Sequence, residues 1–448
     1  MIYQQPKNTL KSGQLILIAG RMLASINSNI VSHNERTAYI AMEIARHHKM
    51  NHKCSLRNLV LLALLHTLGF FREDFFFQNN PHEHTLNYFS IDKETACKYI
   101  FGCYYLNFMT PLGKDALALE DFNLPFNEDL KKYIYQTEYR SIIYLSARIS
   151  DFLLNNPGKK LPSKIIELAP GFIDPELADF FDSYNKNGLI EKGISDNSYK
   201  NKLRNYVAKI KFPAEQNEQL RKLLIYFLDF KSTSTLKHAI NTSCYALSLG
   251  QRMNFSKKEL TVLYESAILH DIGKIATPQR ILEFPGKLSP EDMGIMRYHV
   301  KHSRRILNGL VPEVTLEAVS RHHEKLNGKG YPNHISEKDI TLLQRALTVA
   351  DITSALNDTR SYKEGFSKER TLEILKSMTD NGELDKNVSD IIINDFDSIL
   401  EELPKLQKFL SVDFKHVIER YNDFVLSDFS LEEAAKEDSE DELIETLE

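Results

Sequence analysis

The sequence predicts an all-α protein built from two tandem helical bundle domains, and two observations lead to this prediction. Apolar residues recur at steps of three and four positions, for example between residues 260 and 268, whereas strand-like alternation is nearly absent. Three landmarks also occur twice, in the same order, once in each half of the 448 residues. A duplicated helical domain explains both observations, and a chain of this length has room for two cores.

The first landmark is a histidine that ends an apolar helical run. Residues 63–69 read ALLHTLG, and residues 267–274 read AILHDIGK. A second histidine precedes each of these histidines, His33 by 33 residues and His238 by 32. The two halves therefore share a histidine pair, but a threonine in the first half replaces the aspartate of the second.

Two further landmarks follow the histidine pair. The segment ARISDFLL at 147–154 parallels ALTVADITSAL at 346–356, and each places one aspartate late in its half, Asp151 and Asp351. Then FIDPELADFF in the first half parallels ELDKNVSDII in the second. We expect the two domains to be joined by the polar stretch at 186–201.

The expected domains follow from this repeat. They are a first helical domain at 1–190, a second at 205–425 and an acidic tail at 426–448. Residues 430–448 hold nine acids against one lysine, which is typical of a solvated tail.

Composition excludes several classes of function. The net charge is -5, so the chain carries no basic surface for DNA. No segment approaches the ~18 uninterrupted apolar residues of a membrane span, and the first residues lack the order of a signal peptide. The four cysteines show no CxxC spacing, which argues against a disulfide framework or a zinc knuckle. We therefore expect a cytoplasmic protein without a membrane span.

The second half contains seven side chains suited to binding metal ions. They are His238, His270, Asp271, His299, His322, His323 and Asp351. All lie on segments predicted to be helical, and burying so many polar groups for packing alone would be costly because each needs a partner. A metal supplies that partner. Adjacent helical residues diverge by ~100°, so His270 and Asp271 can approach ions from two directions, and the two aspartate oxygens can bridge two ions.

The motifs around these residues resemble those of a known family. HDIGK at 270–274, PGKLSPED at 285–292, HHEKLNGKGYP at 322–332 and VADITSALNDTRSYK at 349–363 follow one another at family-like spacing. They resemble the HD-GYP phosphohydrolases, all-α enzymes of bacterial signalling that open cyclic di-GMP. The resemblance covers about residues 216–400 and implies that both domains are HD-type helical bundles.

The resemblance assigns the seven ligands to two divalent transition metals. The first ion would be held by His238, His270, Asp271 and Asp351, and the second by Asp271 with His299, His322 and His323. The family favours iron, the mixture of imidazole and carboxylate also fits manganese, and zinc fits the spacing alone. Two ions ~3.5 to 4 Å apart would share a hydroxide that attacks phosphorus. Hydrolysis would give pGpG, GMP or both.

The resemblance also suggests substrate contacts. Lys274, Arg360 and Lys363 match positions that bind the phosphates, and Lys274 joins Asp271 as a catalytic residue. Gly330 and Tyr331 are counted with the substrate-binding residues, and the GYP segment is implicated in contacting diguanylate cyclases. The alternatives are solvated surface charges for the cations and simple turn chemistry for Gly330 and Tyr331.

Two departures from the family pattern leave other functions open. Thr233, Ser234 and Thr235 fill the turn where some members carry a third-metal glutamate, which favours two ions. Ser354 stands where an aspartate is common, so the chain could instead be a weakly active or inactive signalling protein that responds to cyclic dinucleotides. A mixed cyclic dinucleotide is an open alternative substrate. An HD hydrolase of linear nucleotides is a further alternative, against which the GYP segment argues.

We interpret the first half as a degenerate copy of the second, in which part of the metal-binding motif is missing. Thr67 replaces the bridging aspartate, Phe70 stands where Lys274 stands, and no HHE or GYP motif follows. Without the bridging carboxylate two ions would repel each other. We expect this half to bind no metal and to serve in regulation or as a homodimer contact, with its histidines packed and hydrogen-bonded.

Overall fold

The computed structural model describes residues 10–72, 87–129, 135–358 and 365–411, together with residues 417, 419 and 421–423. Every regular element in this part of the chain is an α or 3-10 helix, which confirms the all-α prediction. None of these helices is long and apolar enough to cross a membrane.

The chain forms two compact units, and each unit combines two separate segments. Unit 1 consists of Met1–Ile26 and Lys211–Val412, and unit 2 consists of Asn27–Ile210 and Asp413–Glu448. These units differ from the expected domains, because the first 26 residues belong with the second half of the chain. The expected acidic tail at 426–448 lies outside the described residues.

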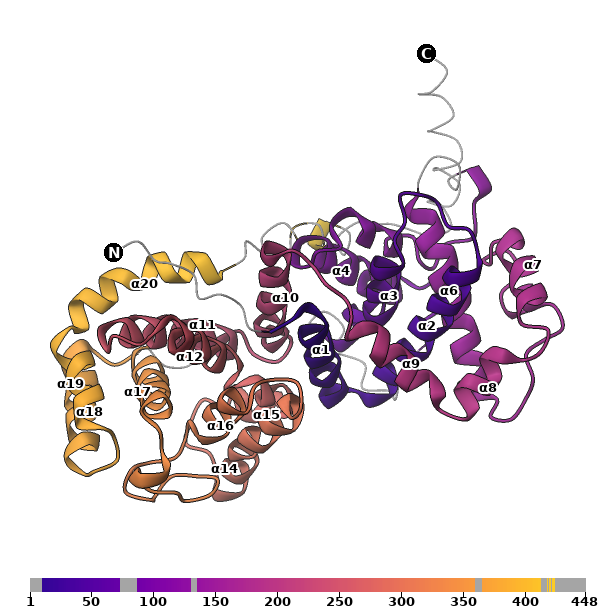
Figure 1. Cartoon of the computed structure of the whole chain (residues 1–448). Coiled ribbons are helices and arrows are strands. Elements are labelled where there is room, and N and C mark those ends of the chain that lie inside the picture. Colours follow the sequence, from indigo (N-terminus) through magenta and orange to yellow (C-terminus); the bar gives the residue numbers. More distant parts are fainter. Residues whose placement is uncertain are drawn as a thin grey trace, which may run out of the picture. The chain divides into compact units, whose positions relative to one another are not determined.

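Unit 1 is a bundle around α11. Its elements are α1 (Ser12–Ile26), α10 (Ala214–Tyr226), η4 (Phe227–Phe230), α11 (Thr233–Arg252), α12 (Lys257–Leu269), η5 (Ile272–Ala276), α13 (Gln279–Leu282), α14 (Pro290–Arg297), α15 (His299–Leu307), α16 (Glu313–Arg321), η6 (Glu337–Asp339), α17 (Leu342–Asn357), α18 (Lys368–Asp380), α19 (Lys386–Asn394) and α20 (Phe396–Leu410). Helix α11 packs against α12, α17 and α20 (Figure 1). This packing brings the long helices of the site side by side.

Side-chain caps fix where the helices of the site begin. The hydroxyl of Ser256 and the carboxylate of Glu259 form a capping box at the start of α12, and Thr341 with Gln344 forms another at α17. The hydroxyl of Ser232 accepts a hydrogen bond from a backbone N–H in the first turn of α11. Because each cap satisfies otherwise unpaired backbone donors, the sequence determines the register of all three helices.

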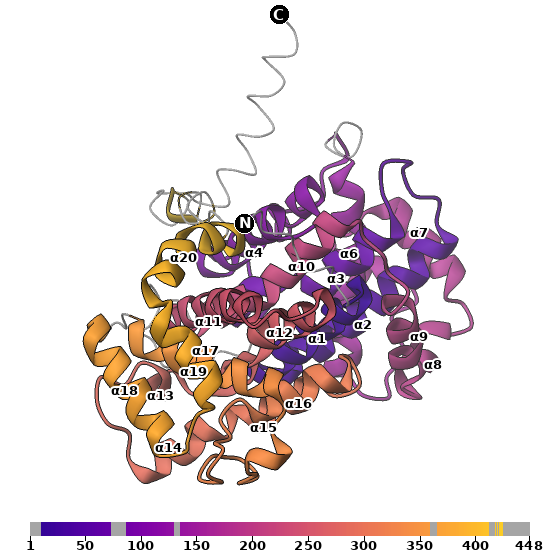
Figure 2. The same cartoon turned by 60° about the vertical axis from the view of Figure 1, so that its left-hand side comes forward.

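Helix α1 is an integral part of unit 1. It packs against α10, η5 and α15 (Figure 2). Leu15, Ile18 and Met22 are among its buried residues. The Arg21 guanidinium donates hydrogen bonds of 2.8 and 2.7 Å to the carbonyls of Ile306 and Asn308. These bonds satisfy carbonyl groups at the C-terminal end of α15. The sequence pattern identifies the helix but does not show which unit it joins.

Unit 2 is a second bundle, centred on α2. Its elements are α2 (Ser28–His47), α3 (Leu56–Leu65), η1 (Leu68–Phe71), α4 (Lys93–Met109), η2 (Gly113–Leu119), α6 (Gln136–Asn155), η3 (Ile165–Leu168), α7 (Pro175–Tyr184), α8 (Leu189–Ser195) and α9 (Ser198–Val207). Helix α2 packs against α3, α6 and α9. The arrangement of α2, α3 and α6 repeats that of α11, α12 and α17, which supports the predicted duplication.

The stretch at 186–201, which was expected to join the domains, includes α8 and the start of α9 and belongs to unit 2. Although most of its residues are polar, α9 has an apolar stripe: Tyr199, Leu203 and Val207 recur at steps of four and are buried. The boundary between the units falls instead after Ile210.

Candidate metal centre

Five regions of unit 1 bring the seven predicted ligands together. In chain order the ligands are His238 on α11, His270 and Asp271 between α12 and η5, His299 at the start of α15, His322 and His323 after α16, and Asp351 on α17. They form three overlapping groups, and within each group the ligand atoms lie within 4.8 Å of one another. Residues more than 100 positions apart in the sequence thus converge on one point.

Asp271 directs its two oxygens to two different sets of histidines. Its Oδ2 lies 3.1 Å from Nε2 of His270 and 3.7 Å from Nε2 of His238. Its Oδ1 lies 3.2 Å from Nε2 of His299 and 3.9 Å from Nε2 of His322. A carboxylate in this position can bridge two cations, one in each set.

Asp351 completes the first set. Its Oδ1 lies 2.9 Å from Nε2 of His238 and 3.7 Å from Nε2 of His270. Its Oδ2 lies 3.5 Å from Nδ1 of His323, which belongs to the second set. The first set therefore contains two imidazoles and two carboxylates, and the second contains three imidazoles and the shared Asp271.

The ring orientation of three ligands is fixed by their own helices. His270, His299 and His322 each donate Nδ1–H to the backbone carbonyl three residues earlier, at 2.7 Å. In the neutral ring Nε2 then carries no hydrogen and presents a lone pair to the site. This is the tautomer that a metal ligand needs.

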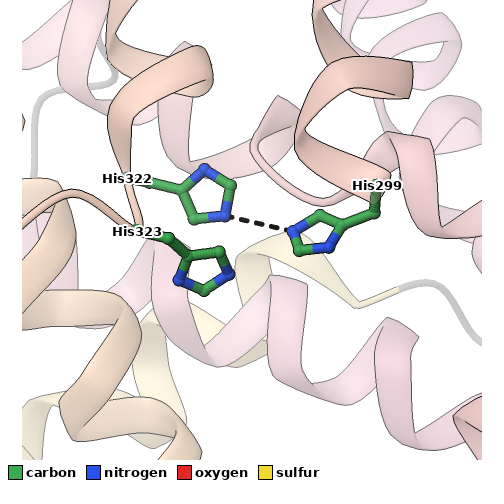
Figure 3. A group of neighbouring side chains, drawn as sticks. All are labelled: His299, His322 and His323. Carbon is green, nitrogen blue, oxygen red and sulfur yellow. Dashed lines mark hydrogen bonds between the residues drawn. The ribbon is translucent and has the colours of Figure 1, made fainter. Parts of the chain in front are cut away.

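The resulting lone pairs face one another. Figure 3 shows the imidazoles of His299, His322 and His323 turned toward one another, with Nε2 of His299 and Nε2 of His322 3.4 Å apart. Neither of these two atoms carries a hydrogen, so their contact is repulsive unless a cation lies between them. Nε2 of His270 and Oδ1 of Asp271 are also buried without a hydrogen-bond partner within the described part of the chain. These residues fit divalent metal ions.

Comparison with known proteins identifies this half of the chain. A family model named HD domain matches residues 222–388, the segment that contains all seven ligands. Residues 222–388 are an HD domain. The HD-GYP resemblance of the motifs is in line with this finding.

The relatives of the HD domain are phosphodiesterases. The 3'3'-cGAMP-specific phosphodiesterase 2 of Vibrio cholerae is 33% identical over 164 residues, which cover 36% of this chain and 31% of that protein. The cyclic di-GMP phosphodiesterase response regulator RpfG of Xanthomonas campestris is 30% identical over 164 residues, which cover 36% of this chain and 43% of that protein. The chain spans about half the length, or less, of the curated relatives it matches.

A solved structure shares the fold over nearly the whole chain. A cyclic GMP-AMP specific phosphodiesterase of V. cholerae matches with a TM-score of 0.57 at 18% identity. The match covers 88% of this chain and 98% of that chain. At this identity the likeness concerns the fold alone, and it extends beyond the HD domain into the first half.

Burial and neighbouring charges set the protonation of the HD-domain ligands. Burial lowers the pKa of His299 to about 3 and that of His322 to about 4, so both rings are neutral. Burial opposes ionisation of Asp271, but the neighbouring His270 and Lys274 hold the pKa of its carboxyl well below the usual range. His299 and His322 thus present neutral imidazoles beside an ionised bridging carboxylate, which are donors that cations require.

His238 differs from the other ligand histidines. Burial opposes its protonation, but hydrogen bonds to Asp351 and Asp358 raise its pKa to about 9. Its Nε2 therefore carries a proton in the absence of a cation. A metal ion that binds this atom must displace that proton.

Two side chains of the HD-domain site, those of His323 and Lys274, are more exposed to solvent than the rest. The side chains of His270, Asp271, His299 and His322 are at most 1% exposed, whereas that of His323 is 24% exposed. The side chain of Lys274 is 17% exposed, and its Nζ lies 2.6 Å from Oδ2 of Asp271. A ligand would therefore approach past His323 and Lys274.

The close fit of η5 against α15 depends on Gly273 and Ser303. A Cβ at Gly273 would lie 2.1 Å from the carbonyl oxygen of His299, so only glycine fits. The hydroxyl of Ser303 accepts a hydrogen bond from Gly273 N–H and donates one to the carbonyl of His270, both at 2.9 Å. Ser303 was not predicted, although its place one turn after His299 puts it on the same side of the helix.

The predicted substrate-binding residues have different outcomes. Gly330 lies so close to Glu324 and Lys325 that a Cβ would meet their backbone at 2.4 Å, and the Tyr331 ring packs against His323 with ring centroids 4.7 Å apart. These contacts explain the glycine by packing and leave the substrate role of both residues a prediction. Arg360 and Lys363 lie outside the described residues.

Unit 2 contains a histidine pair with a similar separation between its rings. The ring centroids of His33 and His66 lie 5.3 Å apart, and Nδ1 of His66 donates to the carbonyl of Ala63 at 2.8 Å. Nε2 of both rings is buried without a hydrogen-bond partner, and no candidate metal group includes either residue within the described ranges. Burial lowers the pKa of both, to about 4 for His66, so the pair is neutral.

The predicted parallel between Asp151 and Asp351 is wrong in detail. The hydroxyl of Ser150 lies 3.2 Å from Nδ1 of His33, just as the hydroxyl of Ser354 lies 3.1 Å from Nδ1 of His238. Ser150 therefore corresponds to Ser354, and the residue three positions earlier, which corresponds to Asp351, is an alanine. The two aspartates differ by one turn of the helix.

Proposed function

We propose that the HD domain is a metal-dependent phosphodiesterase that hydrolyses cyclic di-GMP to pGpG, GMP or both. The observation that carries this proposal is the division of the two Asp271 oxygens between two histidine sets. Two divalent cations that share a carboxylate are a recurring arrangement in enzymes that cleave phosphodiesters. The relatives named as cyclic di-GMP phosphodiesterases support the substrate.

Each residue of the site has a distinct task in this proposal. His238, His270 and Asp351 would hold one ion, His299, His322 and His323 the other, and Asp271 both. Bound ions would neutralise the non-bridging phosphate oxygens and lower the pKa of the attacking water. The buried ligands hold rigid positions, because their rings are fixed by backbone hydrogen bonds.

Lys274 would act on the phosphate itself. Its ammonium group stands at the open side of the site and is oriented by the ion pair with Asp271. A positive charge at this point stabilises the negative charge that grows on the phosphate in the transition state. Arg360 and Lys363 would hold the second phosphate, and Tyr331 with Gly330 would line the approach beside His323.

The donor set fits iron or manganese, and the family resemblance favours iron. Five imidazoles and two carboxylates form a mixed set of borderline and hard ligands, which suits either metal at ordinary distances. Three of the imidazoles belong to one ion and two to the other, so the two ions would differ in affinity. Metal analysis of protein purified without oxygen would identify both.

A second candidate substrate is 3'3'-cGAMP. Three relatives from V. cholerae are named as phosphodiesterases specific for this molecule, at 28% to 33% identity. Both substrates offer the same phosphodiester chemistry to the metals and Lys274, and they differ in one purine. The alternative function is that of a weakly active signalling protein that binds a cyclic dinucleotide. The presence of Ser354 where an aspartate is common suggests this alternative.

The test is a digest of both cyclic dinucleotides with metal-loaded and metal-free protein, followed by chromatography. We expect metal-dependent formation of pGpG or GMP, and faster cleavage of cyclic di-GMP than of 3'3'-cGAMP. The opposite preference would assign the second candidate substrate. Tight binding of either nucleotide without cleavage, in protein that carries two ions, would favour the signalling rival.

Three further parts of the proposal concern the setting of the enzyme. A cytoplasmic location is supported by the four free cysteines, which are typical of a reducing compartment. A homodimer through unit 2 and a diguanylate cyclase contact through the GYP segment stay predictions. Measuring the mass of the chain in solution would test the first, and a pull-down with a purified cyclase would test the second.

A further inference from the structure

The orientation of His238 depends on a residue that the sequence motifs did not indicate. At His270, His299 and His322 the partner of Nδ1 is a backbone carbonyl of the same helix. At His238 it is the carboxylate of Asp358, whose Oδ2 lies 3.0 Å from Nδ1. A charged acceptor holds the ring and also makes its other nitrogen a stronger ligand.

Asp358 is itself held from several sides. The hydroxyl of Ser354 donates to Oδ2 at 2.8 Å, and the amide of Asn241 donates to Oδ1 at 2.5 Å. The amide of Gln407 on α20 donates to Oδ1 of Asn241 at 2.7 Å. Both carboxylate oxygens are therefore occupied, and a chain of hydrogen bonds runs from α20 to the imidazole of His238.

The position of Asp358 relates it to the departure from the family pattern. Ser354 stands where an aspartate is expected, and its buried hydroxyl lies 3.1 Å from Nδ1 of His238. Asp358 follows four residues later, one turn further along α17, so it lies on the same side of the helix end. A carboxylate there reaches the same imidazole past the small serine side chain.

We propose that Asp358 is the positioning residue of the first metal set and replaces the carboxylate that is missing at Ser354. The aspartate has moved by one helical turn, and the serine now links it to His238. This inference rests on the metal site of the proposed function. It explains how a chain with serine at this position can keep a fully oriented set of ligands.

Unit 2 provides an internal comparison. Ser150 makes the same two contacts with His33 that Ser354 makes with His238, to Nδ1 and to the backbone carbonyl oxygen. Four residues after Ser150, at the position of Asp358, the chain has Leu154, whose side chain points away far enough to be 44% exposed. The serine is present in both copies, whereas the carboxylate is present only where the metal ligands are present.

The experiment titrates metal-free protein with Co²⁺ and records the visible absorption of the bound ion. Asp358→Asn keeps the shape of the side chain but removes its charge. We expect the affinity for one of the two ions to fall by about 10- to 100-fold, while the metal-free protein still unfolds in one cooperative thermal transition. Asp390→Asn, which removes an exposed carboxylate on α19, is the matched control and should titrate like the wild type.

An exchange variant makes the test independent of folding losses. Ser354→Asp combined with Asp358→Ser returns the carboxylate to the expected position, and it should regain the wild-type Co²⁺ titration that Asp358→Ser alone loses. The proposal is overturned if Asp358→Asn binds both ions with wild-type affinity, or if the exchange variant binds no better than Asp358→Ser. The readout contains no nucleotide, so a protein that binds two ions but cleaves no cyclic dinucleotide would refute the proposed function alone.

Discussion

In unit 1 the ring centroids of His238 and His270 lie 5.6 Å apart, and in unit 2 those of His33 and His66 lie 5.3 Å apart. Both pairs are buried, and the second histidine of each donates Nδ1–H to the carbonyl three residues earlier. The backbone framework of a metal site is thus present twice. What differs is the set of side chains that surrounds the pair.

At the positions in unit 2 that correspond to Asp271, Asp351 and Asp358, the chain carries no carboxylate. Thr67 stands at the place of Asp271 and donates its hydroxyl to Oδ1 of Asn34 at 2.9 Å. The positions of Asp351 and Asp358 are filled by Ala147 and Leu154. Two neutral imidazoles without an anionic partner cannot offset the charge of a divalent ion, so the framework alone does not make a site.

The remaining ligands have also been replaced in unit 2. A Cβ at Gly69 would lie 1.9 Å from the carbonyl oxygen of Lys98, and a Cβ at Gly273 would lie similarly close to the carbonyl oxygen of His299. Lys98 therefore occupies the position in unit 2 that His299 occupies in unit 1. The Phe122 ring packs against His66 with ring centroids 5.7 Å apart. The comparison shows that the packing around a metal site can be present without the metal ligands, because the close glycine contacts and the helix caps also stabilise the fold.

The largest effect on activity is expected when unit 1 loses the carboxylate of Asp271, which unit 2 lacks at the corresponding position. Asp271→Asn removes the shared anion, so both metal sets lose a ligand and hydrolysis should fall by on the order of 1000-fold or more. Metal content per chain should fall as well. Turnover and elemental analysis measure the two effects, with Asp390→Asn as the control. Wild-type turnover at full metal content would contradict the bridging role.

The next effect concerns the contribution of the first helix to unit 1. A protein that comprises residues 205–425 lacks α1, whose buried side chains contribute about 1.5 to 3 kcal/mol each. That loss is comparable to the whole stability of a typical domain, about 5 to 15 kcal/mol. We expect this protein to melt early and to hold little metal, which calorimetry and elemental analysis would show.

Adding a peptide of residues 10–26 to the shortened protein should restore part of its stability, because α1 packs onto unit 1. A version of 205–425 that melts and binds metal like the full chain would show that α1 is dispensable, and it would support the domain boundaries expected from the sequence. Arg21→Ala in the full chain offers a milder variant, since it removes two hydrogen bonds to the end of α15.

A smaller effect is expected at the position where unit 2 has Phe70. Lys274→Ala should lower turnover by roughly 100-fold with metal content and melting temperature close to wild type, because the lost attraction grows with charge in the transition state. Lys274→Arg keeps the charge and should retain more activity. If Lys274→Ala instead loses stability and activity in equal measure, the ion pair with Asp271 is structural.

The smallest effect at neutral pH is expected in unit 2. His66→Gln should leave the metal content of the chain unchanged, because we expect this pair to bind no ion. Burial lowers the pKa of His66 in the folded chain to about 4, below its ordinary value of 6.5, so the unfolded chain binds the proton first. Stability that is present above pH 6.5 is therefore lost as the pH falls toward 4.

Thermal unfolding of wild type and His66→Gln between pH 7 and pH 4.5 measures this difference. We expect the wild type to lose up to about 2 kcal/mol relative to the variant over this range, because glutamine cannot take up the proton. A pH-independent difference would mean that His66 is not buried in its neutral form. A drop in metal content of the variant would show instead that unit 2 binds an ion.

The convergence of the seven candidate ligands was predictable, because they lie in short motifs whose spacing fixes them on helix faces. The apolar helical stripe before His270 and Asp271 was enough to predict that this pair faces inward. The glycine-rich turn after His322 and His323 was enough to place that pair at the end of a helix. Asp358 was not predictable, because its role depends on where α17 ends and on what α11 presents there. Helix periodicity predicts which face of a helix a residue lies on. It does not predict which side chain a residue beyond the helix end will contact.

The errors have the same origin. Asp151 was paired with Asp351 because both are aspartates late in their halves, but contact with the histidine pairs Ser150 with Ser354. The stretch at 186–201 looked like a linker because polar residues outnumber the apolar stripe of α9. Helix α1 was assigned by its place in the chain, whereas packing assigns it to a unit whose other segment begins at residue 211.

The position of α1 also affects the synthesis of the protein. Translation adds about 5 to 20 residues per second, so α1 leaves the ribosome roughly 15 to 55 s before α15, its partner, exists. A 15-residue helix is marginal on its own in water. During that interval its apolar residues have no native surface to cover them, whereas residues 27–210, the longer segment of unit 2, are already complete. Unit 1 can form only after residues 211–412 have been made, and a chaperone that protects α1 until then would raise the yield of folded protein.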